Sequence, residues 1–486
     1  MLFSRSGFKS ILCIIIAVNT FSGCKKQKTV TPDQEITVVV SSPVTSHWFG
    51  FGFNQYPIDR DVSGNDKTAW NPNNWAIDTN RINYIKPSLV RINLYRSWFN
   101  PSGIAGDYDW NSPHMLAYYQ VMDWYKSKNI PVMAGLWGLN IDNDQAYYTG
   151  SGQNSFQRLQ TDLFTQLYIT KGYTNIKWYT PTNEPKGTGM AFSEWSQMMH
   201  NTYSGFHASG LPTSILCGAD SWDDWTKLAA FSNGADLQGY DHHYYLNAGS
   251  TEATSGNLQN AFKQILSAVK AADPGVKPVF LSESGFCNAD SLDYWYKYTP
   301  SAALNPTTAI YGMLAFDYGI QVAASGQSGS LAWNLGGFDY SKDSGMWNIS
   351  GQSTGNNLRP WFYSWSLLCR YFPAQGIISQ VTLPYTDARM VALKQMVGNK
   401  AHWSFAIVNW AVSSKQLKVT VPGWQGGLFS LYTYSTSAGA YGDGSSLGLK
   451  PQSINIANMQ SGFPVNIPAK SCILLTSMDN VPVSAE

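Results

Sequence analysis

The sequence predicts an α/β fold, a (β/α)8 TIM barrel followed by a C-terminal all-β sandwich domain. From about residue 45 to 340, eight short apolar segments alternate with helix-length amphipathic segments, which is the pattern and size of a closed parallel barrel. After Trp333 the pattern changes to short alternating runs separated by turn residues, which is typical of a sandwich. The length of 486 residues exceeds what one hydrophobic core usually organises and favours two domains.

The predicted barrel strands are apolar and separated by helix-length segments. They are Trp48–Phe53, Leu89–Leu94, Ile130–Leu136, Ile176–Thr180, Ser214–Gly218, Gly239–Tyr244, Pro278–Ser282 and Gly329–Trp333. One helix has clear ends, because Ser112 and Pro113 offer a cap and a first-turn proline, and residues 127–129 end it. An open doubly wound sheet is the alternative. It is disfavoured because no glycine-rich phosphate loop follows the first strand.

A helical stretch from Trp361 to Tyr371 leads into the predicted sandwich. Its strands are Met390–Leu393, Trp403–Val408, Leu417–Val421, Leu428–Tyr434 and Cys472–Thr476. We therefore place the barrel at residues 45–365 and the sandwich at residues 366–480. Residues 25–44 are predicted to form a tether, in which Glu35–Val40 could add a strand to the sandwich.

The N-terminus has the features of a targeting segment. Arg5 and Lys9 precede an apolar run from Ile11 to Val18 that is too short to span a membrane. The following Phe21-Ser22-Gly23-Cys24 resembles the lipobox of bacterial lipoproteins, in which the cysteine is lipidated. We therefore expect residues 1–24 to be a lipoprotein signal peptide and the protein to be exported to the bacterial cell envelope, either to the periplasm or to the outer-membrane surface. An ordinary cleaved signal peptide is the alternative.

The amino-acid composition limits the classes of molecule that the protein is expected to bind. The 32 Lys and Arg residues nearly balance the 31 Asp and Glu residues, which argues against a nucleic-acid partner. The 19 Trp and 28 Tyr residues supply flat apolar faces that suit sugar rings, although most of them are expected to fill the core. Cys217 and Cys472 are interpreted as small core residues. His242 and His243 have no cysteine or acidic pair at zinc spacing, so no metal site is predicted.

Two of the six glutamates follow predicted strands. Glu184 lies in Pro181-Thr-Asn-Glu-Pro185, and Glu283 lies in Ser282-Glu-Ser-Gly285. Active sites of barrels are built at the carboxyl ends of the strands. Cleaving an acetal needs two carboxyl groups there: one protonated to assist the leaving group, the other ionised to attack or stabilise the oxocarbenium-like centre. The two glutamates could meet that need.

Asn183-Glu184-Pro185, followed 99 residues later by Glu283, resembles glycoside hydrolase clan A, the retaining β-glycosidases. The barrel-plus-sandwich plan is most similar to the glucosylceramidase/glucuronoxylanase, β-xylosidase/iduronidase or cellulase-type families of that clan. The resemblance implies that Glu184 is the general acid/base and that Glu283 is the nucleophile.

Further positions match the clan one by one. Arg91 matches a strand-two arginine, whose charge keeps the nucleophile ionised. Asn183 matches the residue that holds the substrate 2-hydroxyl, and Trp333 matches a platform under the reacting sugar. Weaker candidates on other strand ends, each equally able to be packing residues, are Asn54, Trp98, Trp137 and Trp222.

His243 and Tyr245 match a strand-six His-x-Tyr arrangement, in which the tyrosine hydroxyl bonds the nucleophile and the histidine lines the site. His242 and Tyr244 have the same spacing on the opposite face of the strand. We prefer the register with His243 and Tyr245 in the site.

These residues together predict a retaining β-glycoside hydrolase that acts on a β-linked glycan or oligosaccharide by double displacement and requires no metal or organic cofactor. A transglycosylase that uses the same two glutamates is one alternative. A non-catalytic glycan-binding lipoprotein is the other.

Overall fold

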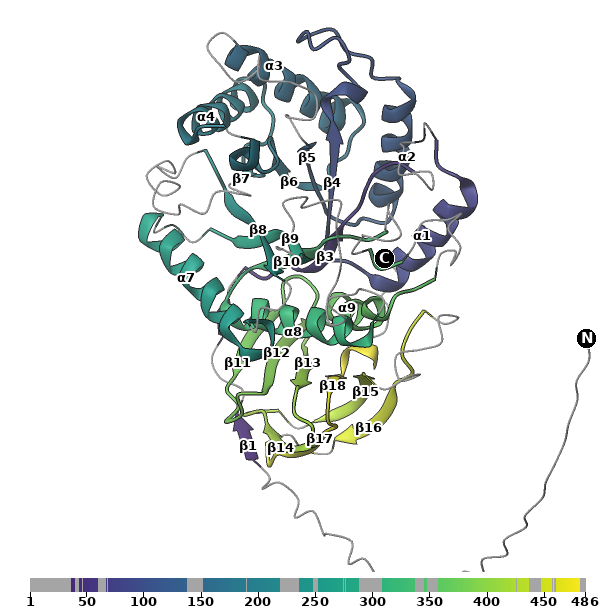
Figure 1. The fold of residues 1–486 in the computed structure, drawn as a ribbon, viewed down its shortest axis with the longest axis vertical. Helices are drawn as coiled ribbons and strands as arrows, with labels where there is room; N and C mark the ends of the chain where they lie inside the picture. The colour runs from purple at the N-terminus through teal and green to yellow at the C-terminus, as the bar shows by residue number, and fades with distance from the viewer. Residues whose placement is uncertain are drawn as a thin grey trace, which may run out of the picture.

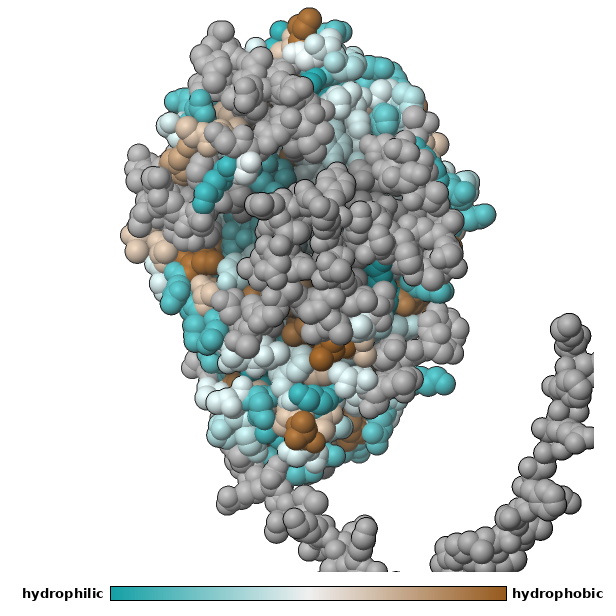
Figure 2. All heavy atoms as spheres, viewed as in Figure 1, coloured by the Kyte–Doolittle hydropathy of each residue, from teal (hydrophilic) through white to brown (hydrophobic). Residues whose placement is uncertain are grey.

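The computed structural model forms a barrel with a β domain packed beneath it (Figure 1). It describes residues 36–39, 43–45, 47–59, 67, 69–137, 152–188, 190–218, 236–247, 252–273, 275, 277–287, 308–336, 345–347, 357–424, 426–436, 447–456, 458 and 460–480. The predicted signal peptide and Cys24 therefore lie outside the described residues. No helix in the described part of the chain is long and apolar enough to span a bilayer. Figure 2 shows a mostly hydrophilic described surface with small hydrophobic patches.

Eight parallel strands form the barrel, each next to its neighbour in sequence. They are β3 (Gly50–Asn54), β4 (Leu89–Tyr95), β5 (Val132–Trp137), β6 (Ile176–Thr180), β7 (Cys217–Gly218), β8 (Gly239–Asn247), β9 (Val279–Cys287) and β10 (Gly329–Ala332). Hydrogen-bonded neighbours follow the order β6, β5, β4, β3, β10, β9, β8, β7. A parallel bridge between Tyr179 in β6 and Leu216, just before β7, closes the barrel between the two ends of this order. The predicted barrel is confirmed, and the open sheet is wrong.

Helices surround the barrel (Figure 1). They are α1 (Pro72–Ile85), α2 (Pro113–Ser127), α3 (Gly152–Phe164), a π-helical turn (Thr165–Thr170), α4 (Phe192–Ala208), α6 (Glu252–Ser255), α7 (Asn257–Ala272), α8 (Ala309–Ser325) and α9 (Pro360–Tyr371). Short 3-10 turns are Arg96–Trp98, Pro185–Thr188 and Met478–Asn480. Helix α2 begins as expected, because the Ser112 hydroxyl accepts a hydrogen bond of 3.2 Å from the backbone N–H of Met115.

An apolar cluster fills the part of the barrel interior below the site. Its buried members are Leu89, Met133, Cys217, Phe280 and Leu331. These residues lie at or near the beginning of their strands, so the amino-terminal end of the barrel is closed by packing. The polar residues that face inward lie further along the same strands, toward the carboxyl-terminal rim.

The C-terminal domain has two sheets, as predicted. The seven-stranded sheet contains β2 (Pro43–Thr45), β11 (Ile377–Val381), β12 (Ala388–Val397), β13 (Lys400–Asn409), β15 (Gly427–Ser435), β16 (Gln452–Ile456) and β18 (Ser471–Thr476). The three-stranded sheet contains β1 (Ile36–Val39), β14 (Lys415–Thr420) and β17 (Phe463–Ile467). β1 pairs in parallel with β14, so the segment ahead of the barrel does add a strand.

The central strands of the seven-stranded sheet, β13 and β18, are buried on both faces. Phe405 and Ile407 pack into the sandwich core, whereas Ala406 and Val408 join the core shared with the barrel. This alternation follows from the two-residue period of a strand. Helix α8 is the intervening layer, and its residues from Tyr311 to Ser325 are buried. Helix α9 runs across the expected boundary between residues 365 and 366.

Candidate active site

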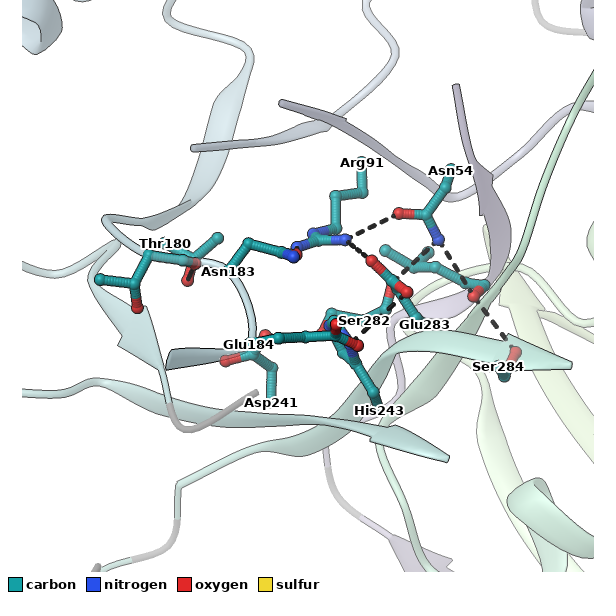
Figure 3. Close-up of polar contacts among 12 residues, drawn as sticks. Asn54, Arg91, Thr180, Asn183, Glu184, Asp241, His243, Ser282, Glu283 and Ser284 are labelled. Carbon is teal, nitrogen blue, oxygen red and sulfur yellow. Dashed lines mark hydrogen bonds and ion pairs between the residues drawn. The ribbon is translucent and has the colours of Figure 1, made fainter. Parts of the chain in front are cut away.

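Side chains from six strands or the loops that follow them converge at the carboxyl-terminal rim of the barrel. Figure 3 shows those from β3, β4, β6, β8 and β9. Asn54 ends β3, Arg91 lies in β4, Asn183 and Glu184 follow β6, His243 and Tyr245 lie in β8, Glu283 lies in β9, and Trp333 follows β10. The contacts described below join all of these except Trp333 into one polar network. Trp333 and Trp137, which ends β5, lie in an aromatic group that borders it.

The two carboxyl groups face one another. An oxygen of Glu184, an oxygen of Glu283 and Nδ1 of His243 all lie within 4.8 Å of one another. Retaining glycosidases hold their two carboxyl groups about 5–5.5 Å apart, whereas inverting enzymes leave about 6.5–9.5 Å for a water molecule. An approach of two carboxylate oxygens to within 4.8 Å is therefore closer to the retaining arrangement than to the inverting one.

Glu283 is almost fully buried, with 2% of its surface exposed, and is held by donors on both oxygens. Nη1 of Arg91 contacts Oε1. The Tyr245 hydroxyl donates to Oε2 at 2.6 Å, and Nδ1 of His243 lies 3.4 Å from the same oxygen. These donors fix the orientation of the carboxylate toward the centre of the rim.

A β-bulge in β9 directs Glu283 inward. On β8, the partners of Leu281 and Glu283 are the consecutive residues His242 and His243, so Ser282 is the extra residue. The register against β10 shifts over the same stretch. In a regular strand, Ser282 and Glu283 would point to opposite faces. The bulge lets both side chains enter the barrel, which is how bulges commonly re-aim residues beside active sites.

Arg91 links three site residues. Its Nη1 donates to Oδ1 of Asn54 at 3.1 Å as well as to Glu283. Its Nη2 donates to Oδ1 of Asn183 at 2.5 Å. Because the guanidinium is planar and only 1% of the residue is exposed, it sets the position of Asn183 relative to Glu283. Sequence reasoning expected Arg91 beside the nucleophile but not its bond to Asn183.

Glu184 adopts a left-handed backbone conformation with a φ of 47°. A residue other than glycine in this region carries a strain of about 1–3 kcal/mol that the surroundings must offset. The preceding residues are fixed, because Gln160 donates to the Pro181 carbonyl at 3.1 Å and the Trp195 indole donates to the Thr182 hydroxyl at 3.2 Å. The turn brings the Glu184 carboxylate to 2.8 Å from Nδ1 of His243.

The charges at the rim are strongly coupled. Burial alone would lower the pKa of His243, but the charge of Glu283 and the hydrogen bond and charge of Glu184 raise it to about 9. Burial would raise the pKa of Glu184, but the hydrogen bond and charge of His243, with Arg91, bring it below its ordinary value. Burial and the charge of Glu283 raise the pKa of Tyr245. At neutral pH, Glu184 and His243 therefore form an ion pair.

On β8, His243 and Tyr245 point into the site, whereas His242 and Tyr244 point to the outside of the barrel. His242 and Tyr244 pack against the ring of Phe262 in α7, with centroid distances of 6.1 and 5.2 Å. Burial lowers the pKa of His242 to about 3, so it stays neutral there. The structure thus gives the register that the sequence left open.

Aromatic rings border the polar centre. Trp333 and Trp137 meet with ring centroids 5.8 Å apart, and Tyr56 stacks on Trp137 at 5.1 Å. Trp98 is mostly buried and stacks on His114, so it serves packing at least in part. Trp333 precedes a cis peptide bond to Asn334. Trp222 lies outside the described residues.

Three residues at or below the rim were not expected from the sequence. Tyr56 joins the aromatic group. Asp241 is fully buried and accepts a hydrogen bond of 2.6 Å from the Ser282 hydroxyl. Asp241 could have been found from the strand period, because it lies two residues before His243 and so on the same face. The inward position of Ser282 depends on the bulge and had no signal in the sequence.

The carboxylate oxygens of Glu184 and Glu283 and a ring nitrogen of His243 lie close enough together to be considered as ligands of a metal ion. They fit one poorly, because Arg91 forms an ion pair with Glu283 and its fixed positive charge would lie beside a bound cation. The group is better suited to acid–base chemistry than to metal binding.

Opposed glutamates at the carboxyl-terminal rim of an eight-stranded parallel barrel define a glycoside hydrolase of clan A. The chain belongs to one of its families, the cellulase family, glycosyl hydrolase family 5, whose model matches residues 47–314, more than half of the chain. This family is one of the three that the domain plan resembles. The family identifies the chain as an enzyme that hydrolyses glycosidic bonds and implies a carbohydrate substrate.

Solved structures share the fold over nearly the whole chain. The catalytic domain of the family 30 xylanase C from Talaromyces cellulolyticus is 14% identical, with a TM-score of 0.64, covering 90% of this chain and 99% of that one. A family 51 α-L-arabinofuranosidase from Bifidobacterium longum is 15% identical, with a TM-score of 0.60, covering 92% and 99%. At these identities the likeness establishes the fold alone. No curated protein sequence matches the chain.

Proposed function

We propose that this protein is a retaining β-glycoside hydrolase with Glu283 as the nucleophile and Glu184 as the general acid/base. The observation that carries the proposal is the pair of opposed carboxyl groups, whose nearest oxygens lie within 4.8 Å. The donors around Glu283 and the partly exposed position of Glu184 give the two groups different environments. Such a difference is what separates an attacking carboxylate from a proton donor.

In the first step, Oε2 or Oε1 of Glu283 attacks the anomeric carbon, and the bond to the leaving oxygen breaks as Glu184 gives that oxygen its proton. Glu184 must be protonated for this step, although its pKa in the substrate-free site is low. A sugar that enters the gap displaces water from around Glu184, and this loss of solvation raises the pKa of Glu184. Substrate binding therefore prepares the acid.

In the second step, Glu184 takes a proton from water, and the resulting nucleophile attacks the anomeric carbon and breaks its bond to Glu283. The configuration at that carbon is inverted twice and so retained. Because Oδ1 of Asn183 accepts from Arg91, its amide N–H group is the end that can donate to the substrate 2-hydroxyl. Trp333 and Trp137 supply the apolar face under the ring.

The experiment that tests this proposal is turnover of aryl β-glycosides by Glu184→Ala and Glu283→Ala variants. We expect Glu283→Ala to be inactive and Glu184→Ala to be slowed most on substrates with poor leaving groups. Glu194→Gln is the matched control, because Glu194 bonds only the start of α4, where it accepts from the Ala191 N–H. Unchanged rates in both alanine variants would exclude the assignment, and NMR of the first-formed anomer reports retention.

The proposed substrate is a β-linked glycan or oligosaccharide met outside the cytoplasm. Aromatic rings beside the polar centre support a sugar ligand, and the structural relatives include proteins named as xylanases. A screen against purified β-glucans, xylans and mannans, with product identification, tests the substrate. The same analysis separates hydrolysis from transglycosylation, because a second sugar on the aromatic group would replace water as acceptor.

The proposed location is the bacterial cell envelope, with a lipid on Cys24. The support is the lipobox-like Phe21-Ser22-Gly23-Cys24 after a short apolar run. A Cys24→Ser variant tests it. Wild-type protein is expected in the detergent phase and the variant in the aqueous phase on partitioning, and equal partitioning would contradict lipidation.

A further inference from the structure

The nucleophile occupies an unusual backbone position that needs support. Ser282 is the extra residue of the bulge in β9, and the register shifts against both neighbouring strands at this point. A bulged residue lacks regular ladder partners on one or both sides, so the direction of the next side chain is less constrained than in a regular strand. Glu283 is that next residue. Glu283 itself pairs with His243 on β8, so the residue whose position needs further support is Ser282.

Side-chain contacts hold Ser282 on two sides. Its hydroxyl donates to Oδ2 of Asp241 in β8 at 2.6 Å, and its carbonyl accepts from Nδ2 of Asn54 in β3 at 2.9 Å. Ser282 and Asp241 are both fully buried. A hydrogen bond from a hydroxyl to a carboxylate is stronger in such a setting than in water. The bulge is therefore clamped between the strand that carries His243 and the strand that carries Asn54 (Figure 3).

Asp241 has no part in the proposed acid–base steps, yet a carboxyl group is costly to bury. Burial raises the pKa of Asp241 above its ordinary value, and the Ser282 hydroxyl and the charges of His243 and Arg91 offset only part of that rise. Asp241, His243 and Tyr245 alternate along β8 and so share its inward face. Asp241 comes first along the strand and therefore lies deeper in the barrel than the other two. Its Oδ2 accepts from Ser282, the extra residue of the bulge that directs Glu283 inward.

From this geometry we propose that Asp241 and Ser282 form a positioning pair for the nucleophile, holding the bulge in the conformation that directs Glu283 at the anomeric carbon. Neither side chain touches the reacting atoms. The pair acts through the backbone that connects Ser282 to Glu283. Misplacing a reacting group by about 1 Å can cost about a hundredfold in rate, so loss of the pair lowers the rate of attack rather than the affinity for substrate.

The test compares four single variants of the full chain, and the double variant Ser282→Ala with Asp241→Ala, on the aryl β-glycoside that wild-type protein turns over best. Ser282→Ala and Asp241→Ala remove the hydrogen bond, whereas Ser282→Thr keeps the hydroxyl and Asp241→Asn keeps an oxygen acceptor. The readouts are kcat, KM, the rate at which an aryl 2-deoxy-2-fluoroglycoside traps Glu283, and the melting temperature. Ser284→Ala is the control at a neighbouring serine, because that hydroxyl contacts the Leu331 carbonyl at 3.1 Å and the Ser330 hydroxyl at 2.7 Å instead of Asp241.

We expect both alanine variants to lower kcat and the trapping rate by about ten- to a hundredfold, with KM changed by less than kcat. The threonine and asparagine variants recover most of the loss. The double alanine variant is no slower than the worse single variant, because the pair acts as a unit. A wild-type trapping rate in Ser282→Ala would overturn the proposal, as would equal losses in Ser282→Ala and Ser284→Ala. Asp241→Ala can destabilise the barrel, so the milder Ser282→Ala decides.

The inference rests on the proposed function, and Glu283→Ala is measured alongside to separate the two. Activity in Glu283→Ala would remove the proposed function itself. An inactive Glu283→Ala together with a fully active Ser282→Ala would remove only the positioning pair.

Discussion

The hydroxyl of Tyr245 donates a hydrogen bond of 2.6 Å to Oε2 of Glu283. This is the oxygen that also lies 3.4 Å from Nδ1 of His243, while Oε1 is engaged by Arg91. Both oxygens of the nucleophile are therefore oriented before substrate arrives, which is the kind of preorganisation that favours attack at one defined point.

Replacing Tyr245 by Phe removes this donor and keeps the ring. Hydrogen bonds to charged groups contribute about 1.5–3 kcal/mol, so we expect kcat/KM to fall by at least about tenfold. Tyr244→Phe is the control, because that residue packs on the outer face against Phe262. Steady-state kinetics on one aryl β-glycoside compares them, and equal rates in the two variants would contradict a role for the Tyr245 hydroxyl.

His243 makes stability depend on pH. Its pKa in the folded chain is about 9, above the ordinary 6.5, because of Glu283 and Glu184. A raised pKa contributes stability that is fully present below pH 6.5 and is lost as pH rises through 9. The free energy of unfolding should therefore fall between these values in wild type but less so in His243→Gln. Denaturant titrations at several pH values measure it.

His242→Gln is the control for that experiment. Burial holds the pKa of His242 near 3, so this side chain is neutral across the same interval. Its replacement should change stability by a constant amount at every pH well above 6.5, where His242 is neutral in the unfolded chain as well. A parallel pH dependence for His242→Gln and His243→Gln would show that His243 is not the group that titrates.

A buried ion pair joins the barrel to the β domain. Asp317 in α8 is fully buried and contacts Arg389 in β12 through both oxygens, and it also accepts from the Trp410 indole at 2.6 Å. Asp317→Asn leaves the arginine poorly paired, which costs about 3–5 kcal/mol in comparable cases. Denaturant unfolding measures the loss. Arg158→Ala, which removes an exposed pair with Asp162, should change stability by less than about 1 kcal/mol.

Trp333→Ala is expected to weaken the hold on the reacting sugar. The ring lies against Trp137 at the border of the site, and an aromatic contact of this kind is worth about 0.5–1.5 kcal/mol beyond its burial. We expect kcat/KM to fall by about two- to tenfold on every β-glycoside that is turned over. Trp110→Ala is the control, since Trp110 stacks on Phe99. A similar fall in both variants would point to general destabilisation.

The sequence by itself determined the order and type of the barrel elements, whereas β2, β11, β16 and β17 of the C-terminal domain were not predicted. Apolar segments of strand length separated by amphipathic helices predicted the barrel, and the Ser112 cap placed the start of α2 correctly. These features depend on local chemistry and on burial of one face, so they can be read along the chain. Asn183-Glu184-Pro185 and Glu283 were likewise identified because residues at the ends of parallel strands must meet at one rim.

Only the tertiary structure decided how these side chains face one another. The inward direction of Glu283 depends on a one-residue bulge, which the pairing of β9 with two neighbours creates and no local pattern encodes. The choice of His243 over His242 depends on which face of β8 meets α7. The raised pKa of His243 depends on two carboxylates that are 59 and 40 residues away in sequence but a few ångströms away in space. Distances and charges of this kind arise only when the strands close around a common centre.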